Sequence, residues 1–421
     1  MKILLLCPHF EPDLHAATGE VMTQLVTSLA DRGHEISVVS ALPWYKDHAV
    51  EPHWRGRLWR TEKTEWGQVV RVWPFPTDKT NIPARAVGFG GFTTLAATAA
   101  LRLGRHDVVM GMSPPVFLGD AAWLVSKRWG VPFVFNTQDI FPDVAVDLGA
   151  LQNRRVIDLA RRHERSIYRR ADAITVLSKD QAYNVSAKLP ESSAEDVVAD
   201  KVHIIQNFAD LGKVSVVERE NAYRSRHGLN GKVVVMYSGN VGLSQSFDLI
   251  RAAAQRWRDF PEVHFVINGE GAARPDVDGW AKPLPNVSVV DFAPRSEVSD
   301  VLGAADLHLI LLKKGLSKSS TPSKLYGILA AGRPVLASID VGSEVASVVE
   351  RANCGRSVPP EQPDMFCEAL DALLAQRQEL ESMGRRARDY VETCLTPAVQ
   401  AEQYEQLFRQ LTECSKQPAV G

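Results

Sequence analysis

From Ser319 to Ser338 the chain reads Ser-Ser-Thr-Pro-Ser-Lys-Leu-Tyr-Gly-Ile-Leu-Ala-Ala-Gly-Arg-Pro-Val-Leu-Ala-Ser. Thr321 is a favourable N-cap, and Pro322 fits the first helical position, where its missing N–H is not needed. Gly332 suits the left-handed residue that ends a helix. Val335–Ala337 then has the composition of a buried strand. The stretch therefore predicts a short helix followed by a strand, as in parallel α/β sheets.

Lys324 is the unusual residue of this stretch. A cation in the first turn of a helix opposes the helix dipole, so a negative group is expected beside it. A helix N-terminus with a nearby ammonium is a typical phosphate site. The alternative is a solvated lysine on a surface helix.

The same strand–helix alternation extends over the rest of the chain and predicts two doubly wound α/β halves. A helix over Glu20–Arg32 carries apolar residues at every fourth position and ends at Gly33. Buried strands are expected at Lys2–Cys7, Ile36–Val39, Asp107–Met110, Phe133–Asn136, Ala173–Leu177, His203–Ile205, Val233–Tyr237, Val263–Ile267, Val287–Val290, Leu307–Leu311 and Val335–Ala337.

The chain is longer than one core usually fills. We expect two Rossmann-like domains, 1–209 and 210–396, that face each other across a cleft. The last helix, at about 397–412, is expected to pack back on the first domain.

Composition is that of an ordinary globular protein, with 45% hydrophobic and 23% charged residues and a formal net charge of −2. This balance argues against a nucleic-acid partner, which needs a strongly basic face. The five cysteines form no C-x-x-C pair, so a zinc site is not expected. The N-terminus lacks a signal peptide, which predicts a cytoplasmic protein.

The stretch 54–105 is a candidate membrane contact. Between residues 51 and 105 there are nine Lys/Arg against four Asp/Glu, interleaved with four tryptophans, and the apolar run 86–101 is too short to span a bilayer. Tryptophan mixed with basic residues favours a lipid headgroup layer, which predicts a peripheral association with the inner face of the membrane. The alternative is a β-hairpin and a core helix within an ordinary domain.

Two glycine turns follow strands of the second half. In doubly wound sheets ligands bind beyond the carboxyl ends of the strands, and glycines let backbone N–H groups approach a phosphate. Neither turn matches a dinucleotide or Walker A motif. The phosphate-site candidates from these turns and from the stretch first quoted are Gly239, Asn240, Gly242, Gln245, Gly269, Glu270, Thr321, Ser323, Lys324 and Gly327.

Taken in order, these features resemble the GT-B glycosyltransferases, specifically the retaining glycosyltransferase family 4, over nearly the whole chain. The motifs that carry the resemblance include Arg32–Glu35, Arg169–Ser178, Val202–Asp210, Gly269–Gly271 and Ala304–Leu307. Gln138–Asp143 and Pro322–Gly327 are similar to enzymes that build bacterial surface polysaccharides on polyprenyl-diphosphate carriers. The resemblance implies a UDP-linked sugar as donor and a lipid-linked or saccharide acceptor, and no cofactor is expected because the nucleotide-sugar is a substrate.

The chain departs from the family pattern at several positions. The usual two glutamates would fall at Ser319 and Gly327, so ribose contact must come from elsewhere. The usual arginine and lysine on the diphosphate would fall at Asn240 and Gln245. Lys324 is the remaining cation, with Lys314 and Lys318 as helpers on the preceding loop.

The histidine usual near the reacting sugar would fall at Gln138. Asp139 is then the nearby group with acid–base capacity, and Gln138 and Asp139 are the catalytic candidates. Asp143 and His15 are the further acceptor-side candidates.

A lysine and backbone dipoles can stabilise the departing phosphate without a metal. The Asp276-Val277-Asp278 motif is expected in a solvated loop, so no divalent ion is predicted. Two other functions stay open: a sugar-nucleotide 2-epimerase, which needs no acceptor, and a non-catalytic sugar-nucleotide-binding protein.

Overall fold

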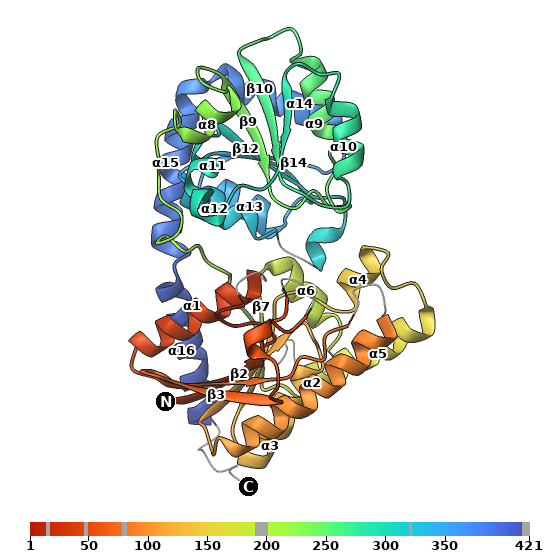
Figure 1. The fold of residues 1–421 in the computed structure, drawn as a ribbon, viewed down its shortest axis with the longest axis vertical. Coiled ribbons are helices and arrows are strands. Elements are labelled where there is room, and N and C mark those ends of the chain that lie inside the picture. The colour runs from red at the N-terminus through yellow and green to blue at the C-terminus, as the bar shows by residue number, and fades with distance from the viewer. Residues whose placement is uncertain (14–16, 46–48, 78–81, 190–200, 320–321, 415–421) are drawn as a thin grey trace. The chain divides into compact units, whose positions relative to one another are not determined.

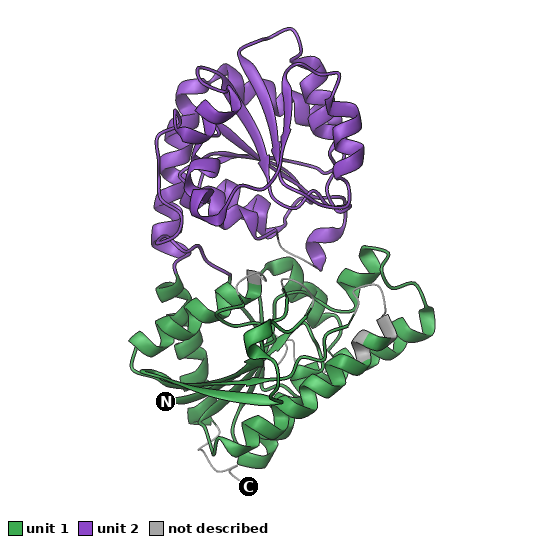
Figure 2. Cartoon of the chain, in the orientation of Figure 1, with its two compact units in different colours: residues 1–206, 397–421 green, residues 207–396 purple. Residues whose placement is uncertain are grey.

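The computed structural model describes residues 1–13, 17–45, 49–77, 82–189, 201–319 and 322–414. The chain divides into two compact units, residues 1–206 with 397–421, and residues 207–396 (Figure 2). Each unit is an α/β sandwich around a largely parallel sheet (Figure 1), which confirms the predicted fold class.

The sheet of unit 1 has eight strands in the order β3-β4-β2-β1-β5-β6-β7-β8, all parallel except the β3–β4 pair. Right-handed crossovers run outward in both directions from β1 and β5, so the helices cover both faces. The elements are β1 (Lys2–Leu6), α1 (Ala17–Asp31), β2 (Glu35–Ala41), β3 (Trp59–Thr64), β4 (Gly67–Val72), α2 (Ile82–Arg102), β5 (Val108–Ser113), α3 (Leu118–Trp129), β6 (Phe133–Thr137), α4 (Asp143–Asp147), α5 (Arg154–Arg170), β7 (Ala173–Val176), α6 (Lys179–Ser186), β8 (Val202–Ile204) and α16 (Pro397–Cys414), with a 3-10 turn at Pro52–Trp54.

The sheet of unit 2 has six parallel strands in the order β11-β10-β9-β12-β13-β14. Its elements are α8 (Ala222–His227), β9 (Val233–Ser238), α9 (Asp248–Arg256), β10 (Val263–Asn268), α10 (Arg274–Ala281), β11 (Val287–Val290), α11 (Val298–Gly303), β12 (Leu307–Leu311), α12 (Lys324–Ala330), β13 (Val335–Ser338), α13 (Glu344–Arg351), β14 (Gly355–Val358), α14 (Pro363–Ala375) and α15 (Arg377–Cys394), with 3-10 turns at Arg295–Glu297 and Leu316–Lys318.

The last helix, α16, packs against α1 in unit 1. Glu405 of α16 binds Arg32 at 2.5 Å, and Tyr404 accepts a hydrogen bond at 2.7 Å from the Asn136 amide of β6. These polar contacts fix α16 to the unit formed by the first half of the chain.

The stretch 54–105 forms the β3–β4 hairpin and α2. Trp54 is buried, with the Arg60 and Arg71 guanidinium groups 4.8 and 5.2 Å from its ring. Phe92 and four alanines of α2 lie in the core of unit 1. Trp59 and Val87 stay exposed. Among the described residues, no helix is both long enough and apolar enough to span a membrane.

Two local predictions are corrected. The helix expected to begin at Pro322 begins at Lys324, because Pro322 and Ser323 accept turn-type bonds from the N–H groups three residues on. Thr321, the expected N-cap, lies outside the described residues. Asp276 and Asp278 lie on α10 rather than in a loop, since buried Val277 gives this segment an apolar face to pack.

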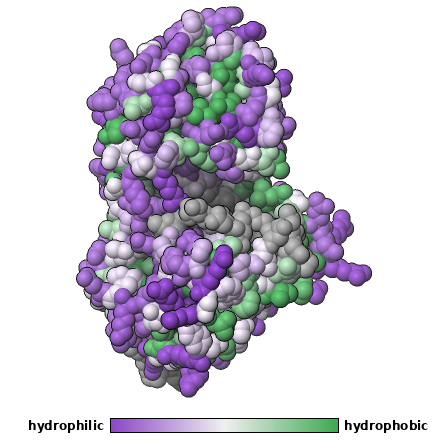
Figure 3. All heavy atoms as spheres, in the orientation of Figure 1, coloured by the Kyte–Doolittle hydropathy of each residue, from purple (hydrophilic) through white to green (hydrophobic). Residues whose placement is uncertain are grey.

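Figure 3 shows that the viewed face of the molecule is largely hydrophilic, with apolar side chains in small patches.

Candidate active site

The strand order of unit 2 reverses between β9 and β12, and the loops beyond their carboxyl ends lie next to each other. Lys313, after β12, donates its backbone N–H to the Ser244 carbonyl of the loop after β9, at 2.9 Å. Such a switch point is where ligands bind in doubly wound sheets.

The glycine turns after β9 and β10 pack backbone against backbone. The Gly239 N–H donates to the Asn268 carbonyl at 2.9 Å, and the Val241 N–H donates to the Glu270 carbonyl at 2.8 Å. Gly269 has φ of 155°, and a Cβ there would lie 1.9 Å from the Gly239 carbonyl oxygen. Only glycine fits this position, so the two turns form one rigid wall.

Lys324 extends from the first residue of α12 to this wall. Its Nζ is buried, lies 3.6 Å from the centroid of the Tyr237 ring, and would be 3.1 Å from a Cβ on Gly239. Among the residues that the structure describes, none accepts a hydrogen bond from Nζ. Burial lowers the pKa of Lys324 to about 7.

Tyr237 fixes the place of this ammonium. Its hydroxyl donates to the Asn240 carbonyl at 2.7 Å, and burial raises its pKa, so the ring is neutral. The ring face offers a weak cation–π contact, which leaves all three N–H donors of a protonated Lys324 for an anion.

The other donor-site candidates differ in what they can offer. The Gln245 Oε1 accepts from the Gly242 N–H at 3.0 Å, so Gln245 braces the β9 loop and occupies that N–H. Asn240, Glu270 and Ser323 are exposed. A Cβ on Gly327 would lie 3.5 Å from Leu302, so this position faces the packed side of α12.

The two helper lysines are exposed on the loop after β12. The backbone N–H of Lys314 donates to Glu361 at 3.3 Å. Neighbouring Gly315 donates its N–H to Asp340 at 2.9 Å, which ties this loop to the segment after β13.

In unit 1, Gln138 and Asp139 directly follow β6. The side-chain amide of Gln138 donates to the Asn136 side chain at 3.0 Å. The backbone N–H of Gln138 donates to the Ser113 carbonyl at the end of β5. Asn136 in turn donates to Thr175 at 2.9 Å. This buried network fixes the backbone from which Asp139, half-buried, projects.

Asp143 is held by neighbouring cations. Lys188 and Arg161 lie 2.7 and 3.2 Å from its carboxylate. Burial alone would raise the pKa of Asp143, but the hydrogen bond and charge of Lys188 lower it overall. Lys188 also binds buried Glu164 at 2.7 Å, so Asp143 anchors α4 to the helices beside it. His15 lies outside the described residues.

A second acid–base pair stands beyond the carboxyl end of β1, which the sequence analysis did not single out. The His9 Nδ1 lies 3.1 Å from the Asp13 carboxylate, and both residues are buried. Burial raises the pKa of Asp13, but the hydrogen bond from His9 and the N–H groups of Trp44 and Tyr45 lower it overall. A neutral ring that donates Nδ1–H to Asp13 would present Nε2 as its acceptor nitrogen.

No cluster of three or more potential metal-ligating side chains occurs in the described parts of the chain. Asp278 of the Asp-Val-Asp motif is paired with Arg274 at 2.9 Å.

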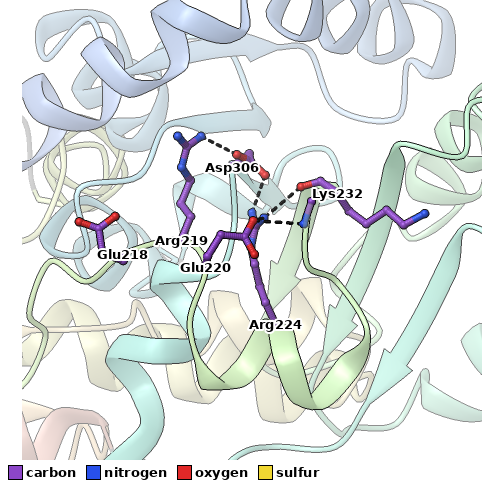
Figure 4. Close-up of a pocket in the computed structure, with 7 residues that line it drawn as sticks. Glu218, Arg219, Glu220, Arg224, Lys232 and Asp306 are labelled. Atoms are coloured by element: carbon purple, nitrogen blue, oxygen red, sulfur yellow. Dashed lines mark hydrogen bonds and ion pairs between the residues drawn. The ribbon is translucent and has the colours of Figure 1, made fainter.

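A polar pocket of about 280 Å³ lies at the opposite edge of the unit 2 sheet (Figure 4). Asp306, just before β12, binds buried Arg224 at 2.6 Å and Arg219 at 2.8 Å. It also accepts from the N–H of Val234 in β9. These charges pair with one another at the amino ends of the strands, so the ion pairs stabilise the sheet. The pocket that they line is not part of the candidate site.

Comparison with known proteins identifies the two units. A sequence model described as "Glycosyl transferase 4-like domain" matches residues 17–206, and one described as "Glycosyl transferases group 1" matches residues 232–376.

One similar relative is WcaI of Escherichia coli strain K12, named as a glycosyl transferase of colanic acid biosynthesis. It is 26% identical over 408 residues, which cover 94% of this chain and 96% of WcaI. Among solved structures, sucrose-phosphate synthase from Thermosynechococcus elongatus matches with a TM-score of 0.71 and 16% identity, covering 98% of this chain and all of that one. HepE from Anabaena, solved with UDP, matches with a TM-score of 0.68 and 13% identity over the same shares. The structural matches confirm the expected GT-B fold.

Proposed function

Since the chain belongs to the family 4 glycosyltransferases of the GT-B fold, we propose that it moves a sugar from a UDP-sugar to a lipid-linked or saccharide acceptor in bacterial surface-polysaccharide synthesis. The reaction breaks the bond between the sugar's anomeric carbon and the β-phosphate oxygen and forms one to an acceptor hydroxyl. The anomeric configuration is retained, as in the enzymes that the chain resembles.

The observation that carries this proposal is the ammonium of Lys324, which is buried beside the Gly239–Gly242 turn and has no hydrogen-bond acceptor among the described residues. An uncompensated buried cation is unfavourable, and a diphosphate would supply the missing charge and hydrogen-bond acceptors. Lys324 thereby stabilises the charge that develops on the departing phosphate without a metal ion. The family's usual cations are absent at Asn240 and Gln245, so this role falls to Lys324.

UDP as the donor nucleotide has support from structural neighbours. HepE has been solved with UDP and with UDP-glucose. WcaI, which the chain resembles over almost its full length, is named for colanic acid biosynthesis, and this favours a surface-polysaccharide acceptor.

On the acceptor side, Asp139 receives the proton of the attacking hydroxyl. His9, held by Asp13, orients that hydroxyl through Nε2. The lysine and arginine around Asp143 make its carboxylate a poor base, which favours Asp139 over Asp143.

A lipid-linked acceptor requires a peripheral contact with the inner face of the membrane. The exposed Trp59 and Val87 of the stretch 54–105 offer part of such a surface. The buried Trp54 and the core-facing side of α2 are already used inside unit 1.

Turnover assays discriminate the alternatives. We would incubate the protein with UDP- and GDP-sugars, with chelator, and with or without a polyprenyl-diphosphate-linked saccharide. Release of UDP only with acceptor is the expected result. An altered sugar without acceptor would identify a 2-epimerase, and binding without turnover would identify a sensor; either would refute the proposal.

A further inference from the structure

Helix α5 in unit 1 is the most basic element of the chain and has no part in the proposed chemistry. Its 17 residues contain seven arginines against Asp158 and Glu164, a net charge of +5 in a chain whose formal net charge is −2. Asn153 caps its start by accepting from the N–H groups of Arg155 and Val156. The basic charge therefore stands on a well-formed helix.

The two faces of α5 are sharply different. Ile157, Glu164, Ile167 and Tyr168 are buried. The opposite face carries Arg155, Arg162 and Arg169, all exposed, at intervals of seven residues. Residues seven apart lie almost in line along a helix, so these three arginines form one stripe about 21 Å long.

Exposed Asp158, three residues from Arg155 and four from Arg162, is an acidic side chain beside the stripe, and it forms no ion pair with a described residue. In the described ranges, Arg155, Arg162 and Arg169 make no ion pair, and the same holds for exposed Arg154 and Arg165 beside them. The two remaining arginines of α5 are paired instead, Arg161 with Asp143 and Arg170 with Asp120. Five unpaired like charges on one helix repel one another, so a polyanionic partner would stabilise this face.

Large aliphatic side chains stand beside the arginines. Leu159 is 68% exposed and Val156 is 44% exposed, and Leu148, at the end of neighbouring α4, is 52% exposed. Arginine mixed with exposed aliphatic residues is typical of a helix that lies in the headgroup layer. A nucleic acid offers no apolar layer for Leu159, so these residues favour a membrane.

We propose that α5 docks flat on an anionic lipid surface, with the Arg155–Arg162–Arg169 stripe on the phosphates and Leu159 at the acyl boundary (α5 in Figure 1). The docking would hold the enzyme beside a lipid-linked acceptor and in this respect rests on the proposed function. The contact itself needs neither donor nor acceptor.

The test is flotation with vesicles of phosphatidylcholine, with and without phosphatidylglycerol, at low and high salt. Wild type should bind only the anionic vesicles, more weakly as salt rises. The combined R155Q, R162Q and R169Q variant should bind about 100-fold more weakly, from about a fivefold contribution per arginine. The matched control is R251Q, R258Q and R356Q, which removes from unit 2 three exposed arginines that make no ion pair with a described residue, and it should bind like wild type.

Circular dichroism melting checks that both triple variants are folded, and Leu159→Ser should lower the binding that remains at high salt. The docking would be overturned if the wild type did not bind anionic vesicles, or if the stripe variant bound them as tightly as the wild type. It would also be overturned if the control variant lost as much vesicle binding as the stripe variant. Tight binding of duplex DNA, lost in the stripe variant, would overturn it in favour of a nucleic-acid partner. Transfer to a water-soluble acceptor should be unchanged in the stripe variant, so failure of the docking and failure of the proposed reaction are distinguishable.

Discussion

Lys324 shows how far one residue can be interpreted from sequence. Its position against a helix dipole predicted a negative ligand. The structure adds that its ammonium is buried on the Tyr237 ring, with no hydrogen-bond acceptor in the described part of the chain. The start of its helix was predicted two residues too early, because Pro322 suits a first helical turn but lies in a tight turn here.

Lys324→Met should weaken UDP binding by about 1.5–3 kcal/mol, the loss expected for a charge-assisted contact in a buried site. Methionine keeps most of the volume beside Tyr237, so the loss reports the charge. Calorimetric titration measures it, with exposed Lys282→Met as the control. Equal UDP affinity in the Lys324 variant and wild type would remove Lys324 from the donor site.

UDP binding should depend on pH through the same group. Burial holds the pKa of Lys324 at about 7 in the empty site, and a bound diphosphate should raise it. Above pH 7 binding must therefore take up a proton, and affinity should fall by up to about tenfold per pH unit between pH 7 and 9.

Calorimetry at pH 8 in buffers of different ionisation enthalpy measures that proton uptake directly. The Lys324→Met variant should take up none. A wild-type protein without proton uptake at pH 8 would show that another group carries the donor phosphates.

His9 was missed because a His and an Asp four residues apart in a loop do not by themselves predict a functional site. The structure shows that both follow β1 and lie beyond the carboxyl edge of the sheet. His9→Gln should lower turnover about 100-fold and leave UDP affinity unchanged, as expected for a group that acts on the acceptor. The exposed His53→Gln is its control. Full turnover in the His9 variant would leave the pair a purely structural role.

At the scale of elements, strands with a continuous apolar run were the easiest to predict. Leu307–Leu311 and Val287–Val290 have the bounds that their apolar runs indicated. β14 was not predicted, since Gly355 and the exposed Arg356 and Ser357 give it no apolar run. The arginine stripe of α5 was also missed, because its seven-residue spacing is visible only on a helix of known extent.

The packing of α15 on the turn after α12 gives a stability prediction. A Cβ on Gly384 of α15 would lie 2.2 Å from the Gly332 carbonyl oxygen. Gly384→Ala should therefore destabilise the protein by about 1–3 kcal/mol, because two backbones must separate.

Gly279 of α10 is the matched control for this clash, since a Cβ there meets nothing within 4 Å. Gly279→Ala should be neutral or stabilise by about 0.5–1 kcal/mol. Denaturant unfolding compares the two variants. Equal stability of both would mean that α15 does not pack this closely on the turn.

At the scale of the whole molecule, the two α/β units were predictable from the alternation of strands and helices, and their division of labour is the central proposal. Unit 2 holds the donor through Lys324, and unit 1 acts on the acceptor through Asp139. Of two substitutions, one in each unit, only the one at Lys324 should therefore change the donor KM.

Steady-state kinetics of Lys324→Met and Asp139→Asn, with a UDP-sugar and a lipid-linked acceptor, test this division most directly. Lys324→Met should raise the donor KM at least tenfold, and Asp139→Asn should lower kcat by about 100-fold with the donor KM unchanged. If Asp139→Asn kept more than a tenth of wild-type turnover, or if Lys324→Met left the donor KM unchanged, the account would be contradicted.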